Sequence, residues 1–189
     1  MPEKRYLVTP GPTPVPPAVL AATAAPMIHH RSPDFRGTLE RVTERLQQVF
    51  RTENDIVHLT SAGTGAMESA MANLVDPGDP VLVISAGSFG DRWHQLAKAY
   101  GADVDLLEYE WGETPSAEDV AARLAARAAK AVFMTQSETS TDTMPRIVSG
   151  PNRSIVPGRH TSTCEMLVSA HSVSMWFMWP RTMRTGRRK

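Results

Sequence analysis

Short apolar runs alternate with helical patterns between residues 56 and 135, and this alternation constrains the fold more than any other feature. Four runs have the length and residue types of strands, at 56–59, 81–85, 104–109 and 131–135. Short connections between alternating strands and helices favour βαβ units. We therefore predict an α/β fold, a three-layer αβα arrangement around a mostly parallel sheet. Three of the runs end in polar or glycine loops, where open α/β sheets bind ligands.

The small residues after the first run form a candidate anion site. Ala62, Gly63 and Gly65 let a ligand approach the backbone closely, and Thr64 adds a hydroxyl. A helix that starts here points free N–H groups and its positive dipole end at an anion such as phosphate. A tight turn without a ligand is the alternative. The loop lacks the P-loop pattern, so a nucleoside triphosphate is not expected.

Further helices are expected on both sides of this loop. The proline-rich segment 10–17 predicts an extended arm, and a short helix follows over 18–25. Ser32 and Pro33 predict the start of a longer helix, whose apolar stripe up to residue 50 is expected to be core. Later helices are expected at about 91–100 and 117–128.

The composition changes abruptly after residue 142. Residues 143–189 contain eight basic residues and one acidic residue, a net charge of +7, and the neutral total leaves −7 for residues 1–142. The basic and apolar residues of this tail share no helical or strand period. We expect an irregular tail, disordered or produced by a shifted reading frame. The alternative is a tail that binds a membrane surface or a nucleic acid. The irregular tail is favoured, so we expect neither a membrane nor a nucleic acid as a partner.

Several other classes of protein and site are not expected. The sequence has no apolar run of membrane-spanning length and no apolar leader, and its single cysteine, Cys164, suits a reducing compartment, which favours the cytoplasm. Cys164 has no arranged partner for nucleophilic catalysis. His29 and His30 lack an acid or cysteine at ligand spacing, so no metal site is predicted.

Five motifs, taken in order, resemble the class V, fold-type I pyridoxal-phosphate enzymes. They are TPGPTPVP at 9–16, HRSPDF at 30–35, SAGTGAME at 61–68, GSFGDRW at 87–93 and SETST at 137–141. Their order and spacing over residues 5–141 resemble most closely the alanine–glyoxylate or serine–pyruvate aminotransferase group. The resemblance implies an incomplete large domain of a pyridoxal-phosphate transferase.

The resemblance also implies roles for single residues around pyridoxal 5'-phosphate. The phosphate would be bound by the helix-start loop, at Ala62, Gly63 and Thr64. Phe89 would stack on the pyridine ring, unless it is a core aromatic, and Thr139 would hydrogen-bond the cofactor. Gly11 lies where the backbone of that family meets the substrate.

The catalytic lysine of such an enzyme is not found. The lysines are Lys4, Lys98, Lys130 and Lys189, and none matches the position of the Schiff-base lysine. We therefore assign no catalytic residue, and no acid to pair with the pyridine nitrogen. The sequence divides into an arm and lead-in at 1–34, a partial large domain at 35–142 and the tail at 143–189.

The resemblance implies an aminotransferase, and the missing lysine predicts that this chain is inactive alone. The substrates would be a small amino acid such as alanine or serine and a 2-oxo acid such as glyoxylate or pyruvate, and the family would form a homodimer. A desulfurase or lyase of the same cofactor class is one alternative. A non-catalytic remnant that binds a phosphate compound or a partner subunit is another.

Overall fold

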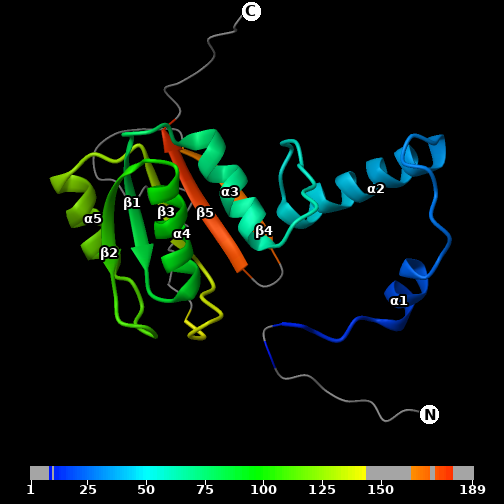
Figure 1. The fold of residues 1–189 in the computed structure, drawn as a ribbon, viewed down its shortest axis with the longest axis horizontal. Helices are drawn as coiled ribbons and strands as arrows, with labels where there is room; N and C mark the ends of the chain where they lie inside the picture. Colours follow the sequence, from blue (N-terminus) through cyan, green and yellow to red (C-terminus); the bar gives the residue numbers. More distant parts are fainter. Residues whose placement is uncertain (1–8, 10, 144–162, 171–172, 181–189) are drawn as a thin grey trace, which may run out of the picture. The chain divides into compact units, whose positions relative to one another are not determined.

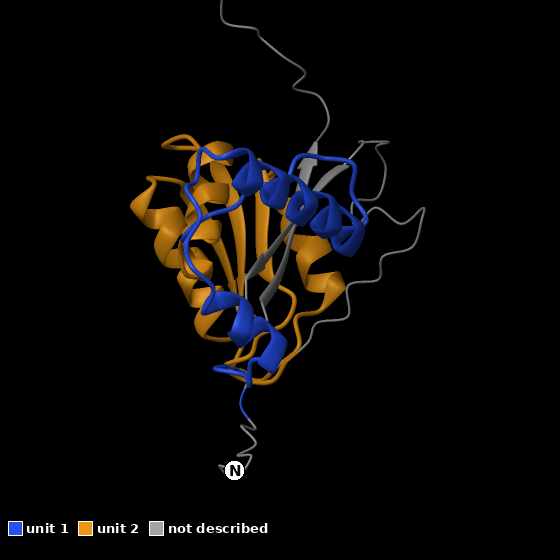
Figure 2. Ribbon diagram, turned by 90° about the vertical axis from the view of Figure 1, so that its right-hand side faces the viewer, with its two compact units in different colours: residues 1–60 blue, residues 61–189 orange. Residues whose placement is uncertain are grey.

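The computed structural model describes residues 9, 11–143, 163–170 and 173–180 (Figure 1). The chain forms two compact units, residues 1–60 and residues 61–189, coloured separately in Figure 2. The division falls between the first apolar run and the small-residue loop that follows it. Each unit is described by itself below.

The first unit contains helices α1 (Pro17–Thr23) and α2 (Pro33–Phe50). Helix α2 begins as predicted, because Pro33 is its first residue and the Ser32 hydroxyl accepts a hydrogen bond from the Phe35 N–H at 3.2 Å. The helix ends at Arg51, whose backbone adopts the left-handed conformation at φ 50°. Local sequence signals are therefore sufficient to place the N-terminal end of this helix.

The apolar stripe of α2 is not core, which corrects the prediction. No residue of α2 is buried; Leu39 and Val42 are each 42% exposed and Val49 is 73% exposed. An amphipathic pattern specifies which face of a helix can be buried, but burial requires a covering element. Helix α1 has no buried residue either.

The run at 56–59 does not form the expected strand. Its residues belong to no helix or strand, and Val57 is 75% exposed. A strand requires a neighbour to accept and donate its backbone hydrogen bonds. None of the described strands pairs with this run.

The second unit is built on a five-stranded sheet in the order β2-β1-β3-β5-β4. Strands β1 (Pro80–Ser85), β2 (Asp103–Glu108) and β3 (Ala131–Thr135) lie close to the predicted runs. Strand β1 pairs in parallel with both neighbours, and Val81 lies opposite Val104 of β2 and Ala131 of β3. The predicted parallel sheet is therefore present over these three strands.

Helices cover both faces of the parallel strands. On one face, α3 (Gly63–Leu74) and α4 (Ser88–Ala99) pack through residues such as Met71 and Trp93 against Val83 and Phe133. On the other face, Val120 of α5 (Ala117–Ala126) packs with Leu82, Ile84 and Leu107. The alternation along β1 follows from the two-residue period of a strand. These two clusters confirm the three-layer αβα arrangement.

Two segments of the tail differ from the expected irregular structure. Strands β4 (Thr163–Ala170) and β5 (Val173–Pro180) pair antiparallel with each other, and β5 pairs antiparallel with β3. The correction has a physical reason: backbone groups along the outer edge of β3 need partners, and ladder pairing requires no amphipathic period in the added strand. The remaining tail residues after 143 lie outside the described residues.

None of the helices in the described part of the chain is long and apolar enough to cross a membrane.

Candidate functional site

The carboxyl ends of β1 and β3 bring three predicted motifs of the second unit together. The chain leaves β1 at Ser85 and enters α4 at Ser88, while the loop after β3 carries Glu138 and Thr139. Hydrogen bonds join this loop to α4, and a hydrogen bond from Arg92 of α4 reaches Thr64 at the start of α3. The structure therefore gathers the phosphate-loop, aromatic and threonine motifs at one edge of the sheet.

The N-terminus of α3 is open to a ligand. None of the described side chains caps this helix, and the first backbone hydrogen bond at its start runs from the Gly65 N–H to the Ala62 carbonyl at 2.9 Å. The N–H groups of Gly63 and Thr64 therefore precede the regular helical bonding and point along the helix dipole. This local geometry fits an anion such as phosphate.

Gly65 is required by close packing inside the same loop. A Cβ atom at this position would overlap the Ser61 side chain, whose Cβ atom lies 2.6 Å from the added carbon. The Ser61 hydroxyl is itself held by donation to the Ala62 carbonyl at 2.9 Å. The small-residue pattern thus reflects packing at Gly65, as well as the access to the backbone that the sequence suggested.

Arg92 adds a positive charge that the sequence analysis did not assign. Its Nη1 atom donates to the Thr64 hydroxyl at 3.3 Å, and the side chain is exposed. A guanidinium has five N–H donors and suits phosphate oxygens. The signal for it was present in the GSFGDRW motif, one helical turn after Ser88, but which loop it reaches depends on the tertiary fold.

The N-terminus of α4, in contrast, is closed by a buried carboxylate. Glu138 is 2% exposed, and its Oε2 atom accepts hydrogen bonds from the N–H groups of Phe89 at 3.0 Å and Gly90 at 3.1 Å. Ser140 donates to Oε1 through its hydroxyl at 2.5 Å and accepts from the Ser88 N–H at 3.0 Å. The N-termini of α4 and α5 are thus capped by side chains, Glu138 and Ser116 respectively, whereas none of the described side chains caps α3.

The cap also explains why α4 begins earlier than expected. The sequence predicted a helix from about residue 91, whereas α4 begins at Ser88. Its N-cap residue is Gly87, which has no side chain to cap with. Glu138 supplies the cap from 49 residues away along the chain, and a local reading cannot detect this contact.

The residues predicted to contact the ring of a cofactor lie beside this cap. Phe89 is half-buried and packs against the core cluster of α3, α4 and β1, as the core alternative expected, while its position at the start of α4 keeps it at the site. Thr139 is half-buried, and its side chain forms no hydrogen bond with the described residues. Gly11 belongs to the first unit, so its role stays a prediction.

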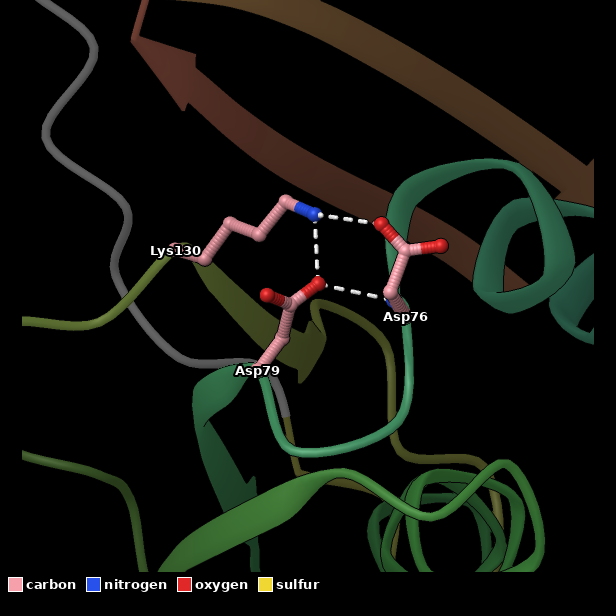
Figure 3. A network of polar contacts seen from close by, with 3 residues as sticks. All are labelled: Asp76, Asp79 and Lys130. Atoms are coloured by element: carbon pink, nitrogen blue, oxygen red, sulfur yellow. Dashed lines mark hydrogen bonds and ion pairs between the residues drawn. The ribbon is translucent and has the colours of Figure 1, made fainter.

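The lysines that the structure describes lie away from this edge. Lys98 is exposed in the last turn of α4, about 15 Å along the helix from Ser88. Lys130 precedes β3 at the amino end of the sheet, where it pairs with Asp79 and, at 3.4 Å, with Asp76 (Figure 3). The other two lysines, at positions 4 and 189, lie outside the described residues.

This ion-pair network shifts two pKa values. The hydrogen bond from Lys130 holds the pKa of Asp79 below its usual value of 3.8, and the Asp76 N–H, which donates to Asp79 at 2.7 Å, acts in the same direction. The hydrogen bond to Asp79 raises the pKa of Lys130 above 10.5. A lysine held as a cation in this way is unsuited to nucleophilic attack. Lys130 therefore serves to join the starts of β1 and β3.

Among the described residues, no three His, Cys, Asp or Glu side chains are grouped so that they could hold a metal ion.

Comparisons with known proteins agree with the motifs. The family model for class-V aminotransferases matches residues 5–149. A protein named soluble hydrogenase 42 kDa subunit from Anabaena cylindrica is 41% identical over 152 residues, which are 79% of this chain and 40% of that protein. The alanine–glyoxylate aminotransferase of Drosophila melanogaster is 33% identical over 72% of this chain and 35% of its own length.

A solved structure agrees as well. The crystal structure of an alanine–glyoxylate aminotransferase from Nostoc sp. has a TM-score of 0.71 and 35% identity, and the match covers 77% of this chain and 40% of that one. The chain thus spans about 40% or less of the length of these relatives.

Proposed function

This chain belongs to the class-V aminotransferase family, and from that premise we propose that it carries the phosphate-binding part of a pyridoxal 5'-phosphate site. The reaction is amino-group transfer from a small amino acid such as alanine or serine to a 2-oxo acid such as glyoxylate or pyruvate. The uncapped N-terminus of α3, with Arg92 beside it and Phe89 and Thr139 at the same sheet edge, carries the proposal.

The described residues fit the phosphate and the ring of this cofactor. The N–H groups of Gly63 and Thr64, beside Ala62, would bind phosphate oxygens, and Arg92 would neutralise part of the phosphate charge. Phe89 would pack on one face of the ring and exclude water there, and Thr139 would offer a hydroxyl that the described residues leave without a hydrogen bond. The cofactor, when bound, supplies the electron sink that the reaction needs.

The two lysines that the structure describes do not complete this site, and we propose that the chain is inactive alone. Lys130 is held at the opposite edge of the sheet by two carboxylates, and Lys98 lies at the far end of α4. An active enzyme would need a lysine and a substrate-binding residue from further polypeptide. The proposal includes a homodimer in the cytoplasm for the whole enzyme.

The test is cofactor binding by the purified chain. Pyridoxal 5'-phosphate is added, the absorbance is followed, and borohydride reduction with mass spectrometry then locates any lysine adduct. We expect binding that is lost in Gly63→Asp, because a carboxylate at the helix start repels phosphate, and kept in Lys98→Ala. An adduct on one lysine that disappears in Gly63→Asp would overturn the claim of inactivity.

The alternative is a non-catalytic remnant that binds a phosphate compound or a partner subunit. The exposed apolar stripe on α2 favours it, because such stripes mark surfaces that another element covers. Competition between inorganic phosphate and pyridoxamine 5'-phosphate for binding distinguishes the cofactor site from the remnant. If inorganic phosphate displaces pyridoxamine 5'-phosphate at equal concentration, the ring contributes nothing to binding and the remnant is the better description.

A further inference from the structure

We propose that Glu138 is a positioning residue, which fixes the start of α4 and the threonine loop relative to each other so that Phe89 and Thr139 face the same bound ring. The inference rests on the proposed function, and it concerns a residue to which that function gives no role. Its basis is one buried carboxylate that joins the start of α4, which follows β1, to the loop that follows β3.

The contacts of Glu138 are divided between the two segments. Its Oε2 atom accepts from Phe89 N and Gly90 N of α4, at 3.0 and 3.1 Å. Its Oε1 atom accepts from the Ser140 N–H at 3.3 Å and the Ser140 hydroxyl at 2.5 Å, within its own loop. All four donors are satisfied by one side chain that is 2% exposed. The carboxylate therefore bridges the two segments.

Close packing at Gly87 shows how tightly this bridge fits. A Cβ atom at Gly87 would lie 2.5 Å from Glu138 Cγ, 2.7 Å from its Cδ and 2.8 Å from Ser140 Oγ. Real Cβ atoms do not approach other atoms this closely. The Glu138 side chain therefore occupies the space that a side chain at Gly87 would need. The Glu138 carboxylate therefore explains the first glycine of the GSFGDRW motif, Gly87.

The bridge also holds Thr139 without using its hydroxyl. Glu138 and Ser140, the residues on either side, are both fixed by the network, and the Ser140 hydroxyl accepts from Ser88 N at 3.0 Å. Thr139 itself makes no side-chain hydrogen bond with the described residues. A hydroxyl that is held in place but not consumed is available to a ligand.

The test measures the binding of pyridoxamine 5'-phosphate to the 189-residue chain, because this cofactor form has no aldehyde to react with surface lysines. Dissociation constants and the induced circular dichroism of the bound ring are compared for Glu138→Gln, Glu138→Ala and Ser140→Ala. The exposed Glu108, which ends β2, supplies the matched control Glu108→Gln. Amide hydrogen exchange at Phe89 and Gly90 reports on the cap independently of any ligand.

We expect the dissociation constant to rise about tenfold in Glu138→Gln, more in Glu138→Ala, and less in Ser140→Ala, which keeps the contacts to Phe89 and Gly90. Amide exchange at Phe89 and Gly90 should accelerate in the Glu138 variants, and the dichroism of the ring should change. Glu108→Gln should match the wild type in all three measurements. Combining Glu138→Gln with Phe89→Ala should raise the dissociation constant by less than the product of the two single effects.

A merely structural cap gives a different result. In that case the Glu138 variants would show faster amide exchange at Phe89 and Gly90, but folded protein would keep the wild-type dissociation constant for pyridoxamine 5'-phosphate and the wild-type dichroism of the ring. This result would overturn the inference. If Glu138→Ala does not fold, Glu138→Gln and Ser140→Ala decide by the same readouts. If the wild-type chain does not bind pyridoxamine 5'-phosphate, the proposed function is wrong, and so is the inference that rests on it.

Discussion

Gly65 illustrates how a single position in the phosphate loop is fixed by its neighbour. A methyl group there would overlap Ser61 at the first turn of α3. We expect Gly65→Ala to lower the free energy of unfolding by about 1–3 kcal/mol, the usual cost of overpacking. Urea denaturation measures it. The double variant Ser61→Gly with Gly65→Ala should recover most of the loss, and an equally unstable double variant would contradict the packing explanation.

Thr135 offers a second test at a single residue, because its hydroxyl is buried at the end of β3 and has no hydrogen-bond partner among the described residues. Replacing it by the isosteric valine removes a desolvated polar group. Thr135→Val should therefore raise the free energy of unfolding by about 1 kcal/mol. The matched control is Thr143→Val: the Thr143 hydroxyl is hydrogen-bonded to that of Thr141 at 2.9 Å, so this variant should lose stability instead.

Between elements, the ion pairs of Lys130 connect the residues that precede β1 and β3, and they should make stability depend on pH. The pKa of Asp79 is lowered, so its contribution exists above 3.8 and disappears as the pH falls through the folded-state value. The pKa of Lys130 is raised, so its contribution exists below 10.5 and disappears as the pH rises through the folded-state value.

Lys130→Met should therefore melt at a lower temperature than the wild type at neutral pH, and the two curves should converge in strong acid and strong base. The gap should be small, because water reaches the pair. Thermal unfolding over a pH series measures it. Lys98→Met, at an exposed lysine for which the described residues offer no ion pair, should show no such pH-dependent gap. If both variants differed from the wild type in melting temperature by the same amount at each pH, the ion pairs of Lys130 would not be the cause.

The elements that sequence patterns predicted well are those whose causes are local. The apolar composition of 81–85 and 131–135 placed β1 and β3 almost to the residue, and Ser32 placed the start of α2. Resemblance of the motifs to class-V aminotransferases is confirmed by the family match over residues 5–149.

The missed features depend on partners far away in the sequence. The early start of α4 depends on Glu138, and the run at 56–59 has no neighbouring strand in the sheet. The stripe of α2 has the pattern of a core face but no cover. For the candidate site, the phosphate loop, the aromatic and the threonine stay predictions from the sequence, whereas the contacts of Arg92 with α3 and of Glu138 with α4 depend on the tertiary fold.

At the scale of the whole molecule, the exposed apolar residues of the first unit should control association more than stability. Val49 is 73% exposed, so Val49→Lys should leave the free energy of unfolding within about 0.5 kcal/mol of the wild type. The same change should reduce self-association in analytical ultracentrifugation. Val83→Lys is the contrasting control, because Val83 is fully buried and a lysine there should unfold the second unit. Unchanged association in Val49→Lys would argue against a role for this surface.

From the charge change after residue 142, we propose that the tail comes from a shifted reading frame. We expect another frame of the downstream DNA to encode a continuation of the aminotransferase domain, including its lysine. Sequencing the locus tests this expectation. If none of the reading frames encodes such a continuation, the proposal of a shifted frame is wrong.

The antiparallel pairing of β5 with β3 has a consequence for any attempt to rebuild the enzyme from pieces. A strand has two ladder edges, and those of β3 are taken by β1 and β5. A separately supplied fragment that extends the parallel sheet at β3 must first displace β5. In reconstitution in trans, the added fragment thus competes with β5 for the same backbone edge of β3. Strand β5 has the advantage that it belongs to the same chain as β3. A chain shortened before residue 163 should accept such a fragment more readily than the full 189 residues.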